Sequence, residues 1–95
     1  MLNSNVYKAI AHPVRRDILK RLRVGPQSAG DLAADYDMSK PSLSAHFTVL
    51  KDADLVFTKR QGNHIHYHLN VSVAEDILSA IMDLFGIEKE NIDDP

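Results

Sequence analysis

The spacing of apolar residues changes from helical to alternating and back again along this chain of 95 residues, and this pattern constrains the fold more than any other feature of the sequence. Before Ala53 they recur every three or four positions, as on amphipathic helices. From Leu55 to Leu69 the period falls to two on either side of residues 61–63, which predicts a β-hairpin. Helical spacing returns from Ser72. The sequence therefore predicts a mainly α-helical domain that contains one β-hairpin.

Prolines and helix-capping residues mark where separate helices begin and end. Proline is tolerated in the first turn of a helix, where its missing N–H is not needed, and a Gly-Pro pair ends a helix. Serine followed three residues later by an acidic residue has the spacing of a capping box. Such boxes are predicted at Ser28/Asp31 and at Ser72/Glu75, and Ser39 is a further N-cap. The predicted helices span residues 1–11, 13–24, a short stretch before Asp37, 40–53 and 72–86.

This order of elements is that of a winged helix-turn-helix domain. The expected fold class is mainly α with a β-hairpin (α-α-α-α-β-β-α), in a single domain over residues 1–95 with an acidic tail at 87–95. In such a domain the second helix of the pair, residues 40–53, reads the major groove of DNA. The wing, residues 55–69, contacts the flanking DNA.

Residue types and motifs needed for several other functions are missing from the sequence. Without cysteine, the chain has no disulfide framework, no thiolate metal site and no thiol chemistry. It also lacks a glycine-rich phosphate loop, a Gly-x-Ser-x-Gly elbow and a His-Glu-x-x-His motif, so we predict neither an enzyme nor a bound cofactor. No apolar run approaches the ~20 residues of a membrane span, and we therefore expect a cytoplasmic protein without membrane insertion.

Charge is distributed unevenly along the chain, although the net charge is only −2. Residues 1–70 hold ten Lys and Arg against six Asp and Glu, a balance of +4. Residues 71–95 hold one against seven, a balance of −6. A basic body with an acidic end is consistent with a nucleic-acid-binding surface on the body.

The candidate DNA-binding residues lie on the polar face of helix 40–53 and at the tip of the wing. Short hydroxyls, one ammonium, one small residue and one imidazole suit contacts to bases, phosphates and a thymine methyl group. A polar surface in contact with solvent would explain the helix residues alone or the wing residues alone. Their combination favours DNA binding. Arg15 and Arg16 fit either DNA contact or internal support of the helix pair. The candidates are Lys40, Ser42, Ser44, Ala45 and His46 on the helix, and Lys59, Arg60 and Asn63 in the wing.

Three histidines in the second strand of the hairpin raise an alternative. His64, His66 and His68 share one face, and His-x-His on a strand can chelate zinc. Positions two apart on a strand lie about 6.6 Å from each other, so two of them can share one ion and three rarely can. The simpler interpretation is the polar outer face of a wing, and we assign no metal ligand. The alternative functions are a metal-responsive repressor that uses these histidines and a winged helix that binds another protein.

Four stretches of the sequence resemble conserved parts of one known family. The stretches AHPVRRDIL (11–19), MSKPSLSAHFTVL (38–50), DLV (54–56) and GNHIHYHL (62–69) resemble its second helix, its recognition helix, the exit into the wing and the returning wing strand. The family is ArsR/SmtB, small winged-helix repressors of bacteria and archaea. The resemblance covers about residues 5–70 and is greatest to the SdpR-type autorepressor branch.

The resemblance implies a homodimeric repressor that binds double-stranded operator DNA. Its first and last helices would form the dimer interface, and two apolar terminal helices also exceed what one small core requires. Metal sensors of the family carry Cys in the short third helix or Asp and His pairs in the last helix. Here the third helix has no Cys and the last helix no His, so the expected signal is an unknown effector or a protein anti-repressor. The expected interface residues are Val6, Ile10, Ile77, Ile81, Leu84 and Phe85.

Overall fold

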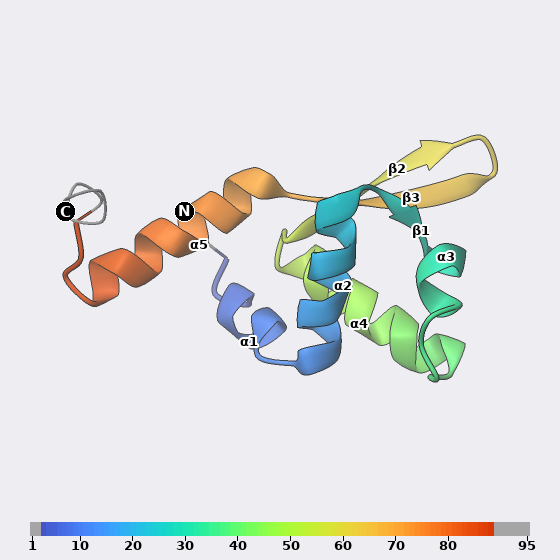
Figure 1. Cartoon of the computed structure of the whole chain (residues 1–95), viewed down its shortest axis with the longest axis horizontal. Helices are drawn as coiled ribbons and strands as arrows, with labels where there is room; N and C mark the ends of the chain where they lie inside the picture. The colour runs from blue at the N-terminus through green and yellow to red at the C-terminus, as the bar shows by residue number, and fades with distance from the viewer. Residues whose placement is uncertain (1–2, 89–95) are drawn as a thin grey trace.

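A computed structural model describes residues 3–88 and shows a helical body from which a β-hairpin and a long terminal helix project in opposite directions (Figure 1). Residues 1–2 of the predicted first helix and residues 89–95 of the predicted acidic tail lie outside the described residues. Among residues 3–88, no helix is long and apolar enough to cross a membrane. The elements are α1 (Val6–Ile10), α2 (Pro13–Val24), β1 (Gln27–Ser28), α3 (Ala29–Ala33), α4 (Lys40–Asp52), β2 (Val56–Gln61), β3 (His64–Leu69) and α5 (Val71–Leu84).

The predicted winged helix-turn-helix architecture is confirmed, and its helices begin where capping chemistry places them. α2 begins at Pro13, and the His12 imidazole caps it by accepting a hydrogen bond at Nδ1 from the Val14 N–H (3.1 Å). α3 opens with the predicted capping box, in which the side chains of Ser28 and Asp31 each accept a bond from the other's backbone N–H. These caps fix where α2 and α3 begin.

A single apolar core lies between the helices and the base of the sheet. α4, capped by Ser39, turns Leu43, Phe47 and Leu50 inward, each at most 5 % exposed, as the i, i+4, i+7 spacing predicts. Phe47 stacks on Tyr67 of β3 with ring centroids 4.7 Å apart, so the predicted recognition helix packs against the base of the wing. The buried core residues are Val6, Ala9, Ile18, Leu22, Leu32, Leu43, Phe47, Leu50, Ala53, Leu55, Val56 and Ile77.

The sheet contains a third strand that the sequence did not predict. β2 and β3 pair antiparallel from Val56↔Leu69 to Gln61↔His64, as expected for the hairpin. β1 pairs with the other edge of β3 at residues 27 and 28, which gives the strand order β1-β3-β2. Two residues are too few to show an alternating pattern, so this strand is recognisable only from its pairing.

The start of the last helix differs from the prediction. α5 begins at Val71 and is capped by Asn70, whose side-chain oxygen accepts a hydrogen bond from the Val73 N–H (3.4 Å). The predicted capping box at Ser72 and Glu75 is therefore wrong. The cause is the sheet: the Asn70 N–H donates to the carbonyl oxygen of residue 55 (3.0 Å), which fixes extended backbone directly after β3 and lets the helix begin at the next residue.

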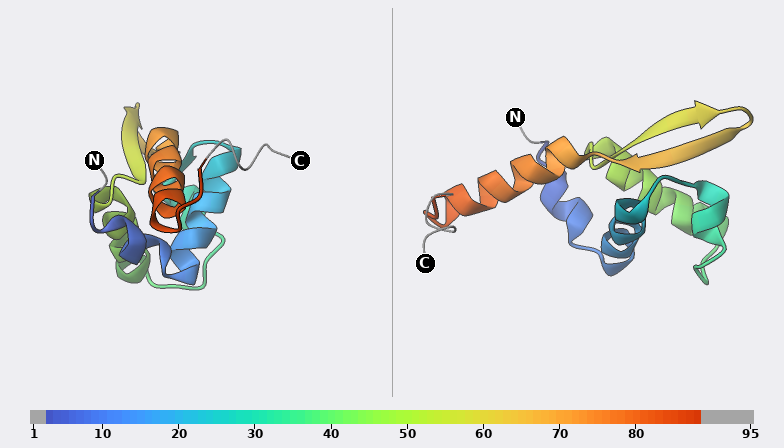
Figure 2. Two further views of the ribbon diagram at one scale, coloured as in Figure 1. Left: turned by 90° about the vertical axis from the view of Figure 1, so that its left-hand side faces the viewer. Right: turned by 45° about the horizontal axis from the view of Figure 1, so that its top comes forward.

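α5 projects from the body (Figures 1 and 2), and much of its apolar surface is exposed. Near its start, Ile77 is buried in the core, and Val73 and Ile81 pack partly against that core. Towards its end, Leu84 and Phe85 are 73 % and 76 % exposed. A helix attached to its own domain only at its base has an apolar surface available for a partner.

The turn that follows α4 contains a residue whose backbone conformation is sterically unfavourable. Asp54 adopts the left-handed conformation (φ +61°), and the following Leu55 N–H donates to the Leu50 carbonyl oxygen (3.0 Å), which is the Schellman arrangement. At the end of α5 the equivalent position is occupied by Gly86 (φ +69°). Glycine adopts this conformation without steric cost, whereas Asp54 does not.

Candidate nucleic-acid interface

The N-terminal half of α4 presents a polar surface to solvent. Four of the five helix residues predicted to contact DNA, namely Lys40, Ser42, Ser44 and Ala45, are exposed there. Ser39, the N-cap, donates a hydrogen bond from its hydroxyl to Ser42 Oγ (2.9 Å). The positive end of the helix dipole lies at the same place and favours a phosphate. Hydroxyls, an ammonium and the helix N-terminus are thus together on one exposed surface.

His46, the fifth predicted contact, lies differently from the expectation. Its ring is half-buried against the N-terminal end of α2, with its centroid 4.5 Å from that of His12. Its Nδ1 lies 3.3 Å from Nη1 of Arg15. Burial, and then the neighbouring His12 and Arg15, lower the pKa of His46 from its usual value. The imidazole therefore contacts α2 and is separated from the exposed side chains of α4.

Arg15 and Arg16 support α1 from within the domain. Arg15 donates from Nε to the Ala9 carbonyl oxygen (2.7 Å) and from Nη2 to the Lys8 carbonyl oxygen (3.0 Å). Arg16 donates from Nη1 to the Ile10 carbonyl oxygen (3.0 Å). These carbonyls lie at the C-terminal end of a five-residue helix, where they lack partners within the helix. Of the two roles open for these arginines, the structure shows internal support.

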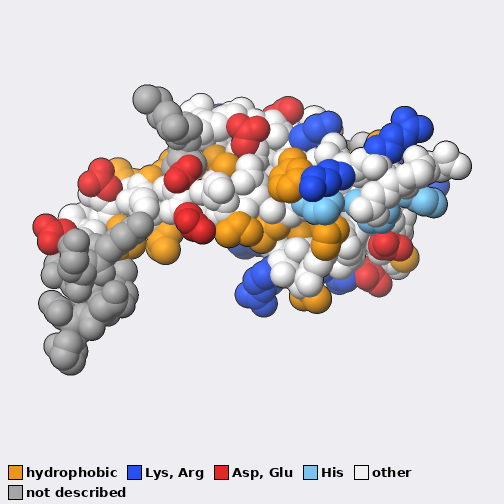
Figure 3. Space-filling model, turned by 90° about the horizontal axis from the view of Figure 1, so that it is seen from above, with side chains coloured by type: hydrophobic (Ala, Val, Ile, Leu, Met, Phe, Trp, Pro, Cys, Tyr) orange, Lys and Arg blue, Asp and Glu red, His pale blue; other side chains and the backbone are white. Residues whose placement is uncertain are grey.

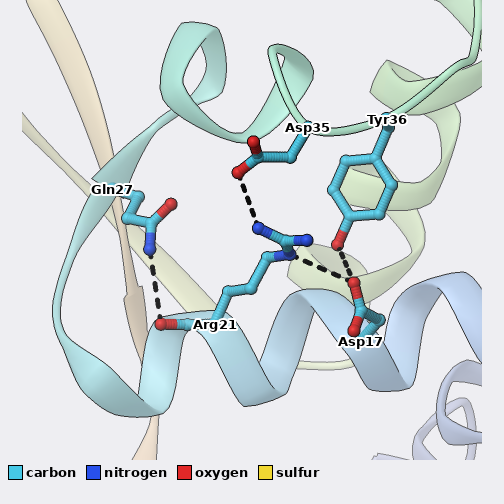
Figure 4. A network of polar contacts seen from close by, with 5 residues as sticks. All are labelled: Asp17, Arg21, Gln27, Asp35 and Tyr36. Atoms are coloured by element: carbon cyan, nitrogen blue, oxygen red, sulfur yellow. Dashed lines mark hydrogen bonds and ion pairs between the residues drawn. The ribbon is translucent and has the colours of Figure 1, made fainter.

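A polar cluster that was not predicted from the sequence holds the loop between α3 and α4 against α2 (Figure 4). Tyr36 donates from its hydroxyl to Asp17 Oδ2 (2.5 Å), and the same oxygen accepts from Arg21 Nε (3.1 Å). Arg21 also pairs with Asp35 (2.6 Å). Hydrogen bonds from Tyr36 and then from Arg21 lower the pKa of Asp17. Burial, followed by the bond to Asp17, raises the pKa of Tyr36 to about 12. The cluster therefore ties the turn of the helix-turn-helix to α2.

The wing carries its predicted polar residues at an exposed tip. Lys59, Arg60 and Asn63 are all exposed. Arg60 donates from Nε to the carbonyl oxygen of Gly62 (3.2 Å), which keeps its guanidinium beside the turn. Gly62 itself has φ +62°, as the first central residue of a type II′ turn requires. On the face drawn in Figure 3, Lys and Arg side chains gather with histidines at the hairpin end, while acidic side chains lie along α5.

The wing histidines do not converge on a common point. The rings of His64 and His66 meet edge to face with centroids 6.5 Å apart. His68 instead stacks on Phe57 of β2, with centroids 5.1 Å apart. Within residues 3–88, no three His, Asp or Glu side chains are arranged to hold a metal ion. The geometry therefore lends no support to a metal-responsive role for these residues.

The residues expected at a dimer interface differ in their exposure. Val6 is 0 % exposed and packs within its own chain, so it has no surface left to bury against a partner. Ile77 is also buried in the core, and Ile10 and Ile81 are partly buried against it. Only Leu84 and Phe85 of the expected set are largely exposed in the single chain. The exposed apolar side chains of α5 are Val71, Leu78, Leu84 and Phe85, each at least 57 % exposed.

Known proteins resemble this chain in both sequence and structure. A family model described as a helix-turn-helix domain matches residues 10–56. The transcriptional repressor SdpR of Bacillus subtilis (strain 168) is 41 % identical over 83 residues, which cover 87 % of this chain and 92 % of that protein. A solved ArsR family transcriptional regulator has a TM-score of 0.72 at 29 % identity, covering 88 % of this chain and 96 % of the other. The transcriptional repressor BigR from Xylella fastidiosa has a TM-score of 0.66 at 30 % identity, covering 86 % and 84 %.

Proposed function

This chain belongs to the ArsR/SmtB family of DNA-binding, winged-helix transcriptional repressors, and on that basis we propose that it represses transcription as a homodimer bound to a specific operator. α4 enters the major groove and the wing contacts the flanking DNA. The observation that carries this proposal is the division of α4 into two sides. Its apolar side is buried in the core, and its exposed N-terminal half carries the ammonium, the hydroxyls and the small residue that suit a groove.

The residue types assign different contacts to the two elements. Ser42 and Ser44 exchange hydrogen bonds with bases or phosphates, Ala45 approaches a thymine methyl group, and Lys40 pairs with a phosphate. In the wing, Lys59, Arg60 and Asn63 contact phosphates or minor-groove edges. His46 positions α4 through its contact with Arg15 and does not read bases.

The two copies associate through the exposed apolar surface of α5, with Ile10 and Ile81 at its margin. Val71, Leu78 and Phe85 are seven residues apart, so they lie on one side of the helix and form a continuous apolar stripe. Exposed apolar stripes of this kind mark association surfaces. A two-fold dimer presents two α4 helices to half-sites about 34–36 Å apart on a palindromic operator.

The resemblance to the SdpR-type branch favours the chain's own upstream region as one operator. The family consists of transcriptional regulators and not of enzymes, and a repressor acts in the cytoplasm, where its operator DNA lies. The signal that relieves repression is an effector or a protein anti-repressor.

The proposal is tested by fluorescence anisotropy with labelled DNA from the chain's own upstream region and with shuffled DNA of the same composition. We expect operator binding with Kd of roughly 10⁻⁸ M or tighter and at least about 10³-fold weaker binding to shuffled DNA. A library of random duplexes, selected in parallel, finds an operator that lies elsewhere. If no duplex binds at 50 mM salt, where phosphate contacts are strong, the chain is not a DNA-binding repressor.

A further inference from the structure

Three elements of the fold meet at one polar contact made by His12, Arg15 and His46. His12 caps α2, and Arg15 projects from the first turn of that helix. His46 comes from the middle of α4. Arg15 contacts His46 while it also binds the Lys8 and Ala9 carbonyl oxygens of α1. This cluster therefore connects the recognition helix to both α1 and α2.

The hydrogen bonds of the cluster require both imidazoles to be neutral. His12 Nδ1 accepts from the Val14 N–H at 3.1 Å and therefore carries no proton. Arg15 has donors only, so His46 Nδ1 must be the acceptor of the 3.3 Å contact. A proton added to either Nδ1 faces another donor and breaks that hydrogen bond. The α2 cap and the link from α4 to α1 are both lost in this way.

The charged groups around the cluster disfavour protonation further. Arg15 lies against His46, and a second imidazole, His12, lies 4.5 Å away. From α1, Lys8 lines an adjoining hollow together with Arg15 and with Asp52 of α4. Asp52 is six residues beyond His46, about 9 Å along the helix axis. Within residues 3–88 it forms no ion pair within 4.0 Å, so no carboxylate directly compensates a proton on either ring.

We propose that the His12–Arg15–His46 cluster is a proton-sensitive contact that sets the position of α4, so that operator recognition is lost under mildly acidic conditions. The inference rests on the proposed repressor function and adds a signal that this chain senses with its own residues. Because the pKa of His46 is lowered in the folded chain, the stabilisation from its contacts is complete above the usual value of 6.5. It is lost progressively as the pH falls from 6.5 through the lowered value.

General electrostatic attraction to DNA also depends on pH and must be separated from this effect. Any positive charge that the protein gains in acid strengthens its binding to every DNA sequence. The useful quantity is therefore the ratio of the affinities for operator and for shuffled DNA of equal length. That ratio cancels general attraction and reports the position of α4.

The experiment measures this ratio for the full chain from pH 7.5 to pH 5.5 at constant ionic strength. One proton expelled on binding changes affinity up to tenfold per pH unit. We therefore expect the ratio to fall progressively below pH 6.5, and a ratio that stays constant down to pH 5.5 overturns the proposal. His46→Gln retains an acceptor for Arg15 but takes no proton. The logarithm of its affinity ratio should therefore fall by less than half as much as that of the wild type. His64→Gln, at an exposed position, is the matched control and should show the wild-type fall.

Two further outcomes separate this inference from the repressor function. If His46→Gln retains half or more of the wild-type fall, His46 does not sense the proton and the proposal fails, whereas repression remains supported. If no operator is bound at pH 7.5, the repressor function fails instead, and the histidine NMR resonances of the free protein decide whether the contact is proton-sensitive. A His46 resonance that titrates at or above pH 6.5, or that does not titrate down to pH 5.5, overturns the proposal, and one that titrates between these values supports it.

Discussion

The hydroxyl of Tyr36 donates to the same Asp17 oxygen that accepts from Arg21, so that one carboxylate of α2 holds the loop leading into α4. Asp17 is half-exposed, with 47 % of its side chain accessible, and an ion pair at such a site contributes little. The hydrogen bond from Tyr36 is the more important contact, because the acceptor is charged and the donor is partly buried.

Removal of that hydroxyl should destabilise the domain. We expect Tyr36→Phe to lower the free energy of unfolding by about 1 kcal/mol at pH 7, measured by urea denaturation. Because the pKa of Asp17 is lowered in the folded state, this contribution is present above the usual pKa of 3.8 and is lost as the pH falls through the lowered value. The difference between the proteins should therefore shrink in acid. Tyr7→Phe, at a 42 % exposed position in α1, serves as the control, and equal effects of the two changes would contradict this assignment.

The left-handed conformation of Asp54 predicts a stabilising substitution. Asp54→Gly should raise the free energy of unfolding by about 0.5–1 kcal/mol, because glycine adopts a positive φ without steric cost. Lys51→Gly, three residues earlier and inside α4, should instead lower it by about 1 kcal/mol. Thermal unfolding of both variants checks the opposite signs. A destabilised Asp54→Gly would mean that the aspartate side chain makes a contact worth more than the backbone strain.

Charge placed on the exposed surface of α5 should prevent dimerisation. We expect Phe85→Glu to yield monomers in light scattering and to weaken operator binding, because one subunit reaches only one half-site. The side chain is 76 % exposed in the single chain, so the substitution leaves the core intact. Val24→Glu, at an 86 % exposed position at the end of α2, is the matched control and should remain dimeric. A Phe85→Glu protein that stays dimeric would place the interface elsewhere.

Helix and wing substitutions should differ in what they do to DNA binding. Lys40→Ala and Ser44→Ala should weaken operator binding and reduce its margin over shuffled DNA. Arg60→Ala should weaken both about equally and lower the slope of log affinity against log salt by about one per subunit. Titrations at four salt concentrations distinguish these patterns. An Arg60→Ala protein with altered base preference and an unchanged salt slope would reverse the two assignments.

Local chemistry made much of the fold predictable. The stripe of Leu43, Phe47 and Leu50 and the alternation of the hairpin each identify a buried face from periodicity alone. The capping box at Ser28 is a short-range pattern that the tertiary structure does not disturb. The role of the recognition helix followed from the order of the elements, and the family resemblance, carried by the segments around α2 and α4, added the expectation of a homodimeric repressor.

Features that depend on residues far apart in the chain were not predictable in the same way. Asn70 displaced the expected cap because its N–H pairs with residue 55, a contact across the whole wing. Val6 belongs to the apolar face of the first helix and was expected at the dimer interface, but it is buried in the chain's own core. Periodicity alone does not distinguish a residue buried by a partner from one buried within the chain. The spacing of Asp17 and Arg21, four apart on a helix, was a visible signal for their pair, but nothing local indicated that Tyr36 joins them.

Residues 27 and 28 contact two elements at once. As β1 they pair with β3, and Ser28 also caps α3. A hinge between hairpin and helices would have to break the strand pairing or the cap. We therefore expect the hairpin and the helices to keep a fixed relative position, so that bound DNA has to bend where it does not match them. Flexible base steps that no side chain touches should then contribute to selectivity, because the energy of bending differs from one sequence to another.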